Sequence, residues 1–118
     1  MTSVHIVDDD RARGGMVASL LGSEGYELIT AYDGETAVRR HAEELPDLVI
    51  LDRGLPKMTG EEVTRRIRAT SQTPILMLTS KDIAEDRERA RAAGVDAYLI
   101  KPFNPADLEA AIRPLLAR

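Results

Sequence analysis

Hydrophobic and polar residues follow two alternating patterns along this chain, and the alternation occurs five times. Short apolar runs predict β-strands, and the longer stretches between them, with apolar residues three or four positions apart, predict helices. The predicted strands cover residues 4–7, 26–31, 48–51, 75–78 and 98–100. The predicted helices carry apolar residues at Met16, Val17, Leu20 and Leu21, at Ala37, Val38, Ala42 and Leu45, at Val63 and Ile67, within residues 82–93, and at Leu108, Ala111, Ile112 and Leu115.

Two of the predicted strands, residues 48–51 and 75–78, are apolar at every position. A strand that is covered on both faces shows this pattern, whereas a half-exposed strand alternates. Strands that alternate with helices form a parallel sheet with right-handed crossovers, and the helices lie on both faces. The sequence therefore predicts an α/β domain, in which ligands bind beyond the carboxyl ends of the strands.

Capping residues agree with these boundaries. Thr59, followed three residues later by Glu62, has the pattern of a capping box. Asn104-Pro105 places a cap residue before a proline that suits the first helical position. Gly94 predicts a left-handed end for the fourth helix.

One proline conflicts with the helical pattern near the C-terminus. Pro114 lies inside the last predicted helix, where it has no amide hydrogen to donate to the carbonyl of Ala110. We therefore expect this helix to kink or to end early, near Arg113.

Length and composition narrow the class of protein. A chain of 118 residues suits one domain, which we expect to span residues 1–118. The absence of cysteine excludes disulfides and thiolate metal sites, and the two histidines, His5 and His41, are too few for most zinc sites. The net charge of −4 disfavours direct binding to nucleic acid. No apolar run approaches the ~20 residues of a membrane helix, so we expect a cytoplasmic protein that does not contact a membrane.

Polar residues that suit catalysis or metal binding follow four of the five predicted strands. Asp8 and Asp9 follow the first strand, and Asp52 follows the third. Thr79 follows the fourth strand, and Lys101 follows the fifth. If the strand order is 2-1-3-4-5, the first and third strands are neighbours. The three acids then converge at one edge of the sheet.

Carboxylates gathered within a few ångströms repel one another unless a cation lies among them. Oxygen ligands favour a hard divalent ion, and Mg²⁺ fits best because it takes one or two carboxylates and shares a phosphate. Mn²⁺ is the alternative ion. Asp52 beside such an ion, with Lys101 and Thr79 to hold phosphoryl oxygens, forms a phosphoryl-transfer site in which Asp52 is the nucleophile.

Each of these residues also has an ordinary structural interpretation. Asp10 is better explained as the cap of the first helix than as a metal ligand. A single strand-end acid is more often a cap, a single threonine a turn residue, and a single lysine a solvated charge. Their occurrence together, each after its own apolar strand, favours a functional site.

At these positions the sequence resembles the response regulator receiver family over essentially its whole length. The resemblance implies a CheY-like, flavodoxin-like (βα)5 doubly wound sandwich, with a five-stranded parallel sheet in the order 2-1-3-4-5. Four segments carry the resemblance. Val7-Asp8-Asp9 is similar to the family's acidic pair, and residues 51–56 are similar to its phosphoacceptor loop. Leu78-Thr79-Ser80 is similar to its hydroxyl segment, and Lys101-Pro102-Phe103 to its lysine-proline segment.

The resemblance also implies the roles of the acidic residues. Asp52 is the phosphoacceptor and receives its phosphoryl group from a sensor histidine kinase. Asp9 and Asp52 ligate Mg²⁺ directly, together with the backbone carbonyl of Gly54. Asp8 acts on the ion largely through water.

Other implied roles concern the response to phosphorylation. Thr79 and Tyr98 form a switch, in which Thr79 follows the phosphoryl group and Tyr98 rotates inward. Lys101 contacts the phosphoryl oxygens, and the bond between Lys101 and Pro102 is expected to be cis.

Further details are similar to the OmpR/PhoB-type class of transcription regulators, and they include Asp82, Asp86-Arg87 and residues 103–105. In that class the fourth helix, fifth strand and fifth helix form a homodimer face held by ion pairs. Ala97 and Ala111 stand where the class has an acid and a base, so we expect this face to be weakened or rearranged. The candidate residues for the dimer face are Arg87, Asp96 and Asp107.

One departure from the family lies next to the nucleophile. Arg53 stands where the family usually has an apolar residue. We expect its aliphatic stem to pack against the protein and its charged head to reach water.

Three other interpretations remain open. A pseudo-receiver would keep the fold as an interaction module without phosphorylation. A magnesium-dependent phosphohydrolase would need a second acid two residues after the nucleophile, where this chain has Gly54. A purely structural domain leaves the strand-end acids unexplained. The resemblance favours a signalling phosphoacceptor and not an enzyme. Such a domain catalyses only its own phosphorylation and dephosphorylation.

Overall fold

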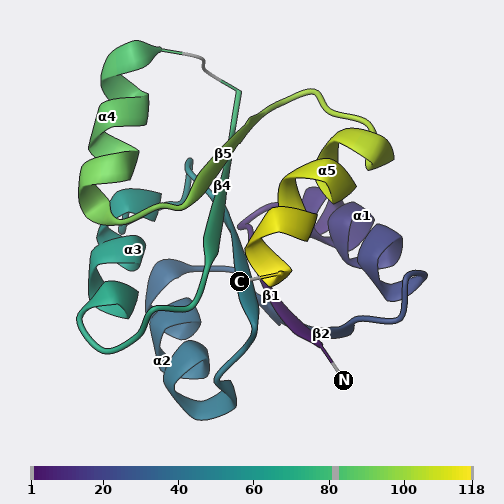
Figure 1. The fold of residues 1–118 in the computed structure, drawn as a ribbon. Coiled ribbons are helices and arrows are strands. Elements are labelled where there is room, and N and C mark those ends of the chain that lie inside the picture. The colour runs from purple at the N-terminus through teal and green to yellow at the C-terminus, as the bar shows by residue number, and fades with distance from the viewer. Residues whose placement is uncertain (1, 81–82, 118) are drawn as a thin grey trace.

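Five parallel strands form one sheet in the order β2-β1-β3-β4-β5 in the computed structural model, which describes residues 2–80 and 83–117. The predicted fold class and strand order are confirmed, with helices on both faces of the sheet (Figure 1). The strands are β1 (Ser3–Val7), β2 (Glu27–Ala31), β3 (Leu48–Asp52), β4 (Ile75–Thr79) and β5 (Ala97–Ile100). The helices are α1 (Arg11–Gly22), α2 (Gly34–Glu44), α3 (Gly60–Arg68), α4 (Ala84–Ala93) and α5 (Pro105–Leu116).

Two hydrophobic clusters fill the space between the sheet and its helices. Helices α1 and α5 cover one face, and α2, α3 and α4 cover the other (Figure 1). The first cluster includes Val17 and Ile112, and the second includes Val63 and Ile67. Strands β3 and β4 are buried at every position, as expected of strands covered on both faces. The last residues of these two strands, Asp52 and Thr79, are therefore fixed by the packing around them.

Most helix ends follow the predicted capping pattern. Asn104 and Asp107 form a complete capping box, because the side chain of each accepts a hydrogen bond from the backbone amide of the other. Thr59 accepts from the amide of Glu62, whereas the Glu62 carboxylate pairs with arginines of its own helix. Gly94 ends α4 in the left-handed region, with φ of 112°.

The last helix is longer than the sequence suggests. Helix α5 continues through Pro114 to Leu116, so the expected early end near Arg113 is wrong. Leu115 is buried in the cluster beneath α1 and α5, and this packing outweighs the one lost backbone hydrogen bond. The fourth helix begins at Ala84; residue 82, the expected start, lies outside the described residues. No helix within residues 2–80 and 83–117 is both long and apolar enough to cross a bilayer.

A histidine lies in the middle of the sheet. His5 is fully buried on β1 between Ile29 and Val49 of the neighbouring strands. Neither ring nitrogen of His5 has a hydrogen-bond partner among the described residues. Burial, together with the positive charges of Arg40 and His41, lowers the pKa of His5 from 6.5 to about 4. The folded protein therefore holds this imidazole neutral at physiological pH.

This buried imidazole makes stability depend on pH. Below its ordinary pKa of 6.5 the unfolded chain binds a proton that folded His5 rejects until about pH 4, so stability falls as the pH drops through this window. Relative to His5→Val, the wild type should lose about 2 kcal/mol of unfolding free energy between pH 7 and pH 5. Urea unfolding of both proteins across this range measures the difference. Parallel curves would show that His5 does not titrate in this way.

Candidate functional site

Three carboxylates from two neighbouring strands meet at the carboxyl edge of the sheet. Val7 of β1 lies opposite Leu51 of β3, so the next residues, Asp8 and Asp52, lie side by side. One carboxylate oxygen from each of Asp8, Asp9 and Asp52 lies within 4.8 Å of the other two. Asp8 and Asp52 are buried and Asp9 is exposed. The structure thus brings together the three predicted metal ligands, with one side open to solvent.

This donor set fits a hard divalent cation. Three carboxylates provide the oxygen ligands that Mg²⁺ and Mn²⁺ prefer, and their oxygens are close enough together to share one ion. Gly54 lies beside them, because a methyl group added at Gly54 would lie 3.7 Å from Oδ2 of Asp52. The role of the Gly54 carbonyl as a ligand stays a prediction.

Lys101, which follows β5, contacts Asp52. Nζ of Lys101 lies 2.7 Å from Oδ1 of Asp52, and the Asp52 side chain is only 4% exposed. Thr79, at the end of β4, is buried, and its carbonyl accepts a hydrogen bond of 2.7 Å from the Lys101 amide. The bond between Lys101 and Pro102 is cis, as the resemblance implied. Lys101 is therefore bonded through its backbone to the last residue of β4 and through its side chain to the last residue of β3.

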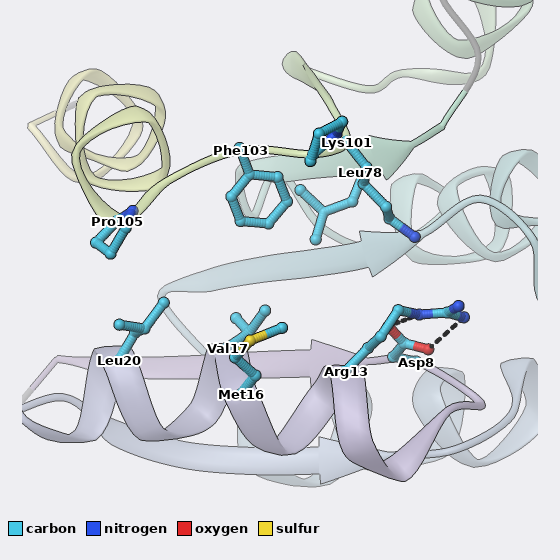
Figure 2. A pocket seen from close by; sticks show the side chains of 10 residues that line it. Asp8, Arg13, Met16, Val17, Leu20, Leu78, Lys101, Phe103 and Pro105 are labelled. Atoms are coloured by element: carbon cyan, nitrogen blue, oxygen red, sulfur yellow. Dashed lines mark hydrogen bonds and ion pairs between the residues drawn. The ribbon is translucent and has the colours of Figure 1, made fainter.

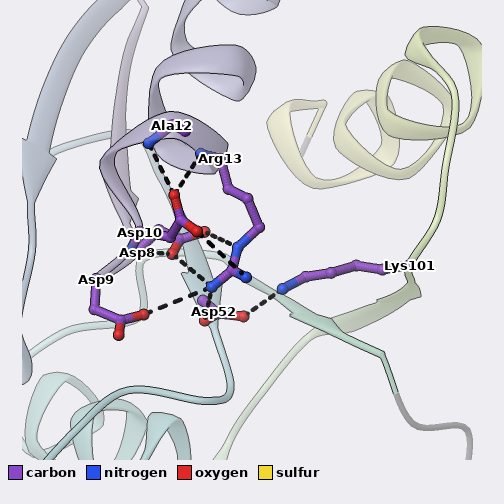
Figure 3. A network of polar contacts seen from close by, with 7 residues as sticks. All are labelled: Asp8, Asp9, Asp10, Ala12, Arg13, Asp52 and Lys101. Atoms are coloured by element: carbon purple, nitrogen blue, oxygen red, sulfur yellow. Dashed lines mark hydrogen bonds and ion pairs between the residues drawn. The ribbon is translucent and has the colours of Figure 1, made fainter.

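Sequence reasoning missed one member of the site, Arg13. Its Nη2 lies 3.3 Å from Oδ1 of Asp8, 3.7 Å from Oδ1 of Asp9 and 3.6 Å from Oδ2 of Asp52. Figure 3 shows this guanidinium reaching from α1 into the group of acids, and the Lys101 side chain pointing toward Asp52. The hydrogen bonds that the Arg13 guanidinium donates to the Asp8 carboxylate, and the negative charge of the surrounding acids, raise the pKa of Arg13. The spacing of four residues between Asp9 and Arg13 was the available sequence signal.

Asp10 is the cap of α1, as the sequence analysis favoured. Its carboxylate accepts hydrogen bonds from the amides of Ala12 at 2.9 Å and Arg13 at 3.1 Å. Both bonds lower the pKa of Asp10, and the bond from the Arg13 amide has the larger effect. Asp10 therefore fixes the start of the helix that carries Arg13.

An apolar groove opens beside the acidic site. Its cavity volume is about 300 Å³, and it lies between α1 and the segment that joins β5 to α5 (Figure 2). Asp8, Arg13 and Lys101 line one end, where Figure 2 shows Arg13 bridging to Asp8. The remaining walls are apolar and include Met16, Val17, Leu20, Leu78 and Phe103. The carboxylate cluster is therefore bordered by a nonpolar surface.

The position of Arg53 corrects an expectation. Its charged head does not extend into water, because Nη2 lies 3.0 Å from Oδ1 of Asp86 and 3.4 Å from Oε2 of Glu61. The Arg53 side chain is 23% exposed, and both acids are 9% exposed. Two acids that lie at the starts of α3 and α4 draw the guanidinium inward. The residue after the predicted phosphoacceptor is thus tied to α4.

Tyr98, the second predicted switch residue, and the predicted dimer-face residues make contacts elsewhere in the chain. Tyr98 is partly buried against the cluster beneath α2, α3 and α4, and the Arg87 guanidinium carbon lies 5.3 Å from its ring centroid. Asp96 pairs with Arg68 and accepts a hydrogen bond from the Ile75 amide at 2.8 Å. Asp107 belongs to the capping box of α5. Their roles in switching and dimerisation stay predictions.

Comparison with known proteins gives consistent results from sequence and structure. The model of the response regulator receiver domain matches residues 4–113. A probable transcriptional regulator, ycf27 of Guillardia theta, is 43% identical over 115 residues, which cover 98% of this chain and 45% of that protein. This chain therefore spans about half the length of the curated relatives it matches.

Two solved structures share the fold of this chain. The chemotaxis protein CheY4 of Vibrio cholerae superposes with a TM-score of 0.94 at 38% identity, covering 98% of this chain and 99% of that one. The receiver domain of the sensor histidine kinase PA1611 from Pseudomonas aeruginosa has a TM-score of 0.91 at 31% identity, covering 99% and 98% of the two chains. That structure has a magnesium ion coordinated in its active-site cleft. The match over residues 4–113, and a fold shared with such domains from end to end, show that this chain belongs to the response regulator receiver family.

Proposed function

We propose that this chain is the phosphoacceptor domain of a two-component response regulator, and that Asp52 receives a phosphoryl group from a histidine kinase. The observation that carries the proposal is the environment of Asp52. Its carboxylate is buried, lies 2.7 Å from Lys101, and shares a cluster with Asp8 and Asp9. A carboxylate that only closed an ion pair would not need two further acids beside it, since these repel it.

The chain's own residues carry the transfer. An oxygen of Asp52 attacks the phosphorus atom of the kinase phosphohistidine, an acyl phosphate bond forms, and the bond from phosphorus to the histidine nitrogen breaks. Lys101 lies where it can neutralise charge on the equatorial oxygens, and the Thr79 hydroxyl is proposed to donate to one of them. Asp8, Asp9 and Asp52 would hold Mg²⁺, with Mn²⁺ as the alternative; the ion supplies further charge neutralisation on the phosphoryl group.

We propose that phosphorylation controls the surface formed by α4, β5 and α5. The pair between Arg53 and Asp86 supports this, because it joins the residue after Asp52 to the first turn of α4. Transcription regulators of about twice this length among the relatives suggest that the surface controls an effector or a homodimer. The domain itself would not bind nucleic acid, would act in the cytoplasm, and would catalyse only its own phosphorylation and dephosphorylation.

Intact-mass measurement after incubation with acetyl phosphate and Mg²⁺ tests the proposal. The wild type should gain the mass of one phosphoryl group, and it should gain none when EDTA removes the ion. Asp52→Asn should stay unmodified, because an amide cannot form the acyl phosphate. Asp10→Asn is the matched control: asparagine also caps a helix, and this variant should be modified like the wild type. Equal modification of the Asp52→Asn variant would move the phosphoacceptor elsewhere, and an unmodified wild type would favour a pseudo-receiver.

A further inference from the structure

The side chain of Arg13 lies among the acids that are proposed to hold the metal ion. Its Nη2 is between 3.3 and 3.7 Å from an oxygen of each of Asp8, Asp9 and Asp52. Its Nε also faces Oδ2 of Asp8 at 3.5 Å. One guanidinium therefore contacts all three predicted ligands at once (Figure 3).

The backbone of Arg13 is fixed, whereas its side chain has room to move. The backbone amide of Arg13 donates a hydrogen bond to the cap residue Asp10, which fixes the position of the Arg13 backbone. The side chain is 46% exposed, and its stem borders the apolar groove together with Met16 and Val17. Rotation about side-chain bonds is enough to move the guanidinium from the acids to solvent.

We propose that Arg13 is an internal competitor of the divalent ion, which lowers the affinity of this site for Mg²⁺; this inference rests on the proposed function. Mg²⁺ needs its ligands at about 2.0–2.1 Å in near-octahedral geometry. The Asp8, Asp9 and Asp52 oxygens cannot provide that geometry while a second cation lies within 3.7 Å of each of them. Mg²⁺ binding therefore requires the guanidinium to leave.

The contact between Arg13 and the three acids opposes Mg²⁺ binding but favours folding. At low Mg²⁺ concentration Arg13 offsets the repulsion among three neighbouring carboxylates, and it thereby stabilises the fold. Once Mg²⁺ neutralises these carboxylates, the contribution of Arg13 is no longer needed. Removing Arg13 should thus weaken the protein in EDTA but strengthen its binding of Mg²⁺.

Calorimetric titration with Mg²⁺ measures the affinity without any phosphoryl transfer. Arg13→Gln and Arg13→Ala should bind Mg²⁺ about three- to tenfold more tightly than the wild type, because the ion no longer displaces a partly exposed arginine from its three acids. The matched control is Arg11→Gln in the same turn of α1, where the guanidinium lies 4.0 Å from the ring centroid of Tyr32. This variant has the same change in net charge and should bind within about twofold of the wild type.

Thermal unfolding gives a second readout with the same proteins. The melting temperature of the Arg13→Gln variant should be lower than that of the wild type in EDTA, and the gap should narrow or close at saturating Mg²⁺. In ¹⁵N-labelled wild type, the Nε–H resonance of Arg13 should shift with the same midpoint as Mg²⁺ binding. This spectrum needs no variant, so it tests the proposal even if both substitutions fail to fold.

The outcomes separate this inference from the proposed function. Wild-type protein that binds Mg²⁺ and gains a phosphoryl group, while both Arg13 variants bind Mg²⁺ no more tightly than the wild type, would overturn the role of Arg13 and leave the function standing. An Arg13 Nε–H signal that ignores Mg²⁺ would have the same meaning. Wild-type protein that binds no Mg²⁺ in calorimetry and gains no phosphoryl group would overturn the proposed function and the inference together.

Discussion

Replacing Lys101 with methionine should slow the phosphorylation of Asp52 about 100-fold. The Lys101 ammonium lies 2.7 Å from Oδ1 of Asp52, where the proposed transfer would place negative charge on the phosphoryl oxygens. Loss of one preorganised donor to such a charge slows enzymes by about 10²–10³-fold. Lys101 is 21% exposed, so solvent partly replaces it, and we expect the lower end of this range.

The initial rate of acyl phosphate formation, followed by intact mass at saturating Mg²⁺, measures this effect. Lys57→Met makes the same chemical change in the exposed loop after β3 and should leave the rate unchanged. Calorimetry on the Lys101→Met variant establishes that Mg²⁺ still binds. A rate for that variant within about threefold of the wild type would remove Lys101 from the transfer step.

Replacing Arg53 with methionine should destabilise the protein by about 2–3 kcal/mol at neutral pH. The substitution leaves Glu61 and Asp86, each with a side chain only 9% exposed, without the guanidinium between them. Breaking a buried pair typically costs about 3–5 kcal/mol. The value here is reduced because Arg53 is 23% exposed and because Arg89 also pairs with Asp86.

Urea unfolding measures this loss of stability, provided that the dependence of the unfolding free energy on urea concentration is the same for both proteins. Arg65→Met is the matched control on α3, because Arg65 pairs with Glu62 at an exposed position and should change stability by less than about 0.5 kcal/mol. The triple variant Arg53→Met, Glu61→Gln, Asp86→Asn should recover much of the loss, since no unpaired charge stays buried. Equal stability of the Arg53→Met and Arg65→Met variants would mean that the Arg53 cluster does not hold α3 and α4 together.

The alternation of apolar runs and helical stretches was enough to predict the fold. Residues 48–51 of β3 and 75–78 of β4 are all apolar because helices cover both faces of the sheet, and this is visible in the sequence. An early end of α5, one of the two outcomes expected at Pro114, is wrong because the local penalty of this proline says nothing about the packing of Leu115 beyond it. Local propensity yields to tertiary packing in such cases.

The core of the site could be predicted because each residue follows its own strand. Parallel strands bring their carboxyl ends to one edge, so Asp8, Asp52 and Lys101 meet whatever the details of the loops. The two arginines were different. Arg13 contacts the acids from a helix, and the partners of Arg53 follow it by 8 and 33 positions in the chain. Such contacts depend on side-chain directions, which hydrophobic periodicity does not specify.

Chemical reduction of the modified protein tests most directly whether Asp52 becomes an acyl phosphate. Borohydride cleaves an aspartyl phosphate and leaves homoserine in its place, which peptide mass spectrometry can assign to one position. After reaction with acetyl phosphate and Mg²⁺, homoserine should be found at position 52 and should be absent when Mg²⁺ is withheld. Homoserine at position 8 or 9, or a phosphoryl group that resists borohydride, would show that Asp52 does not become an acyl phosphate.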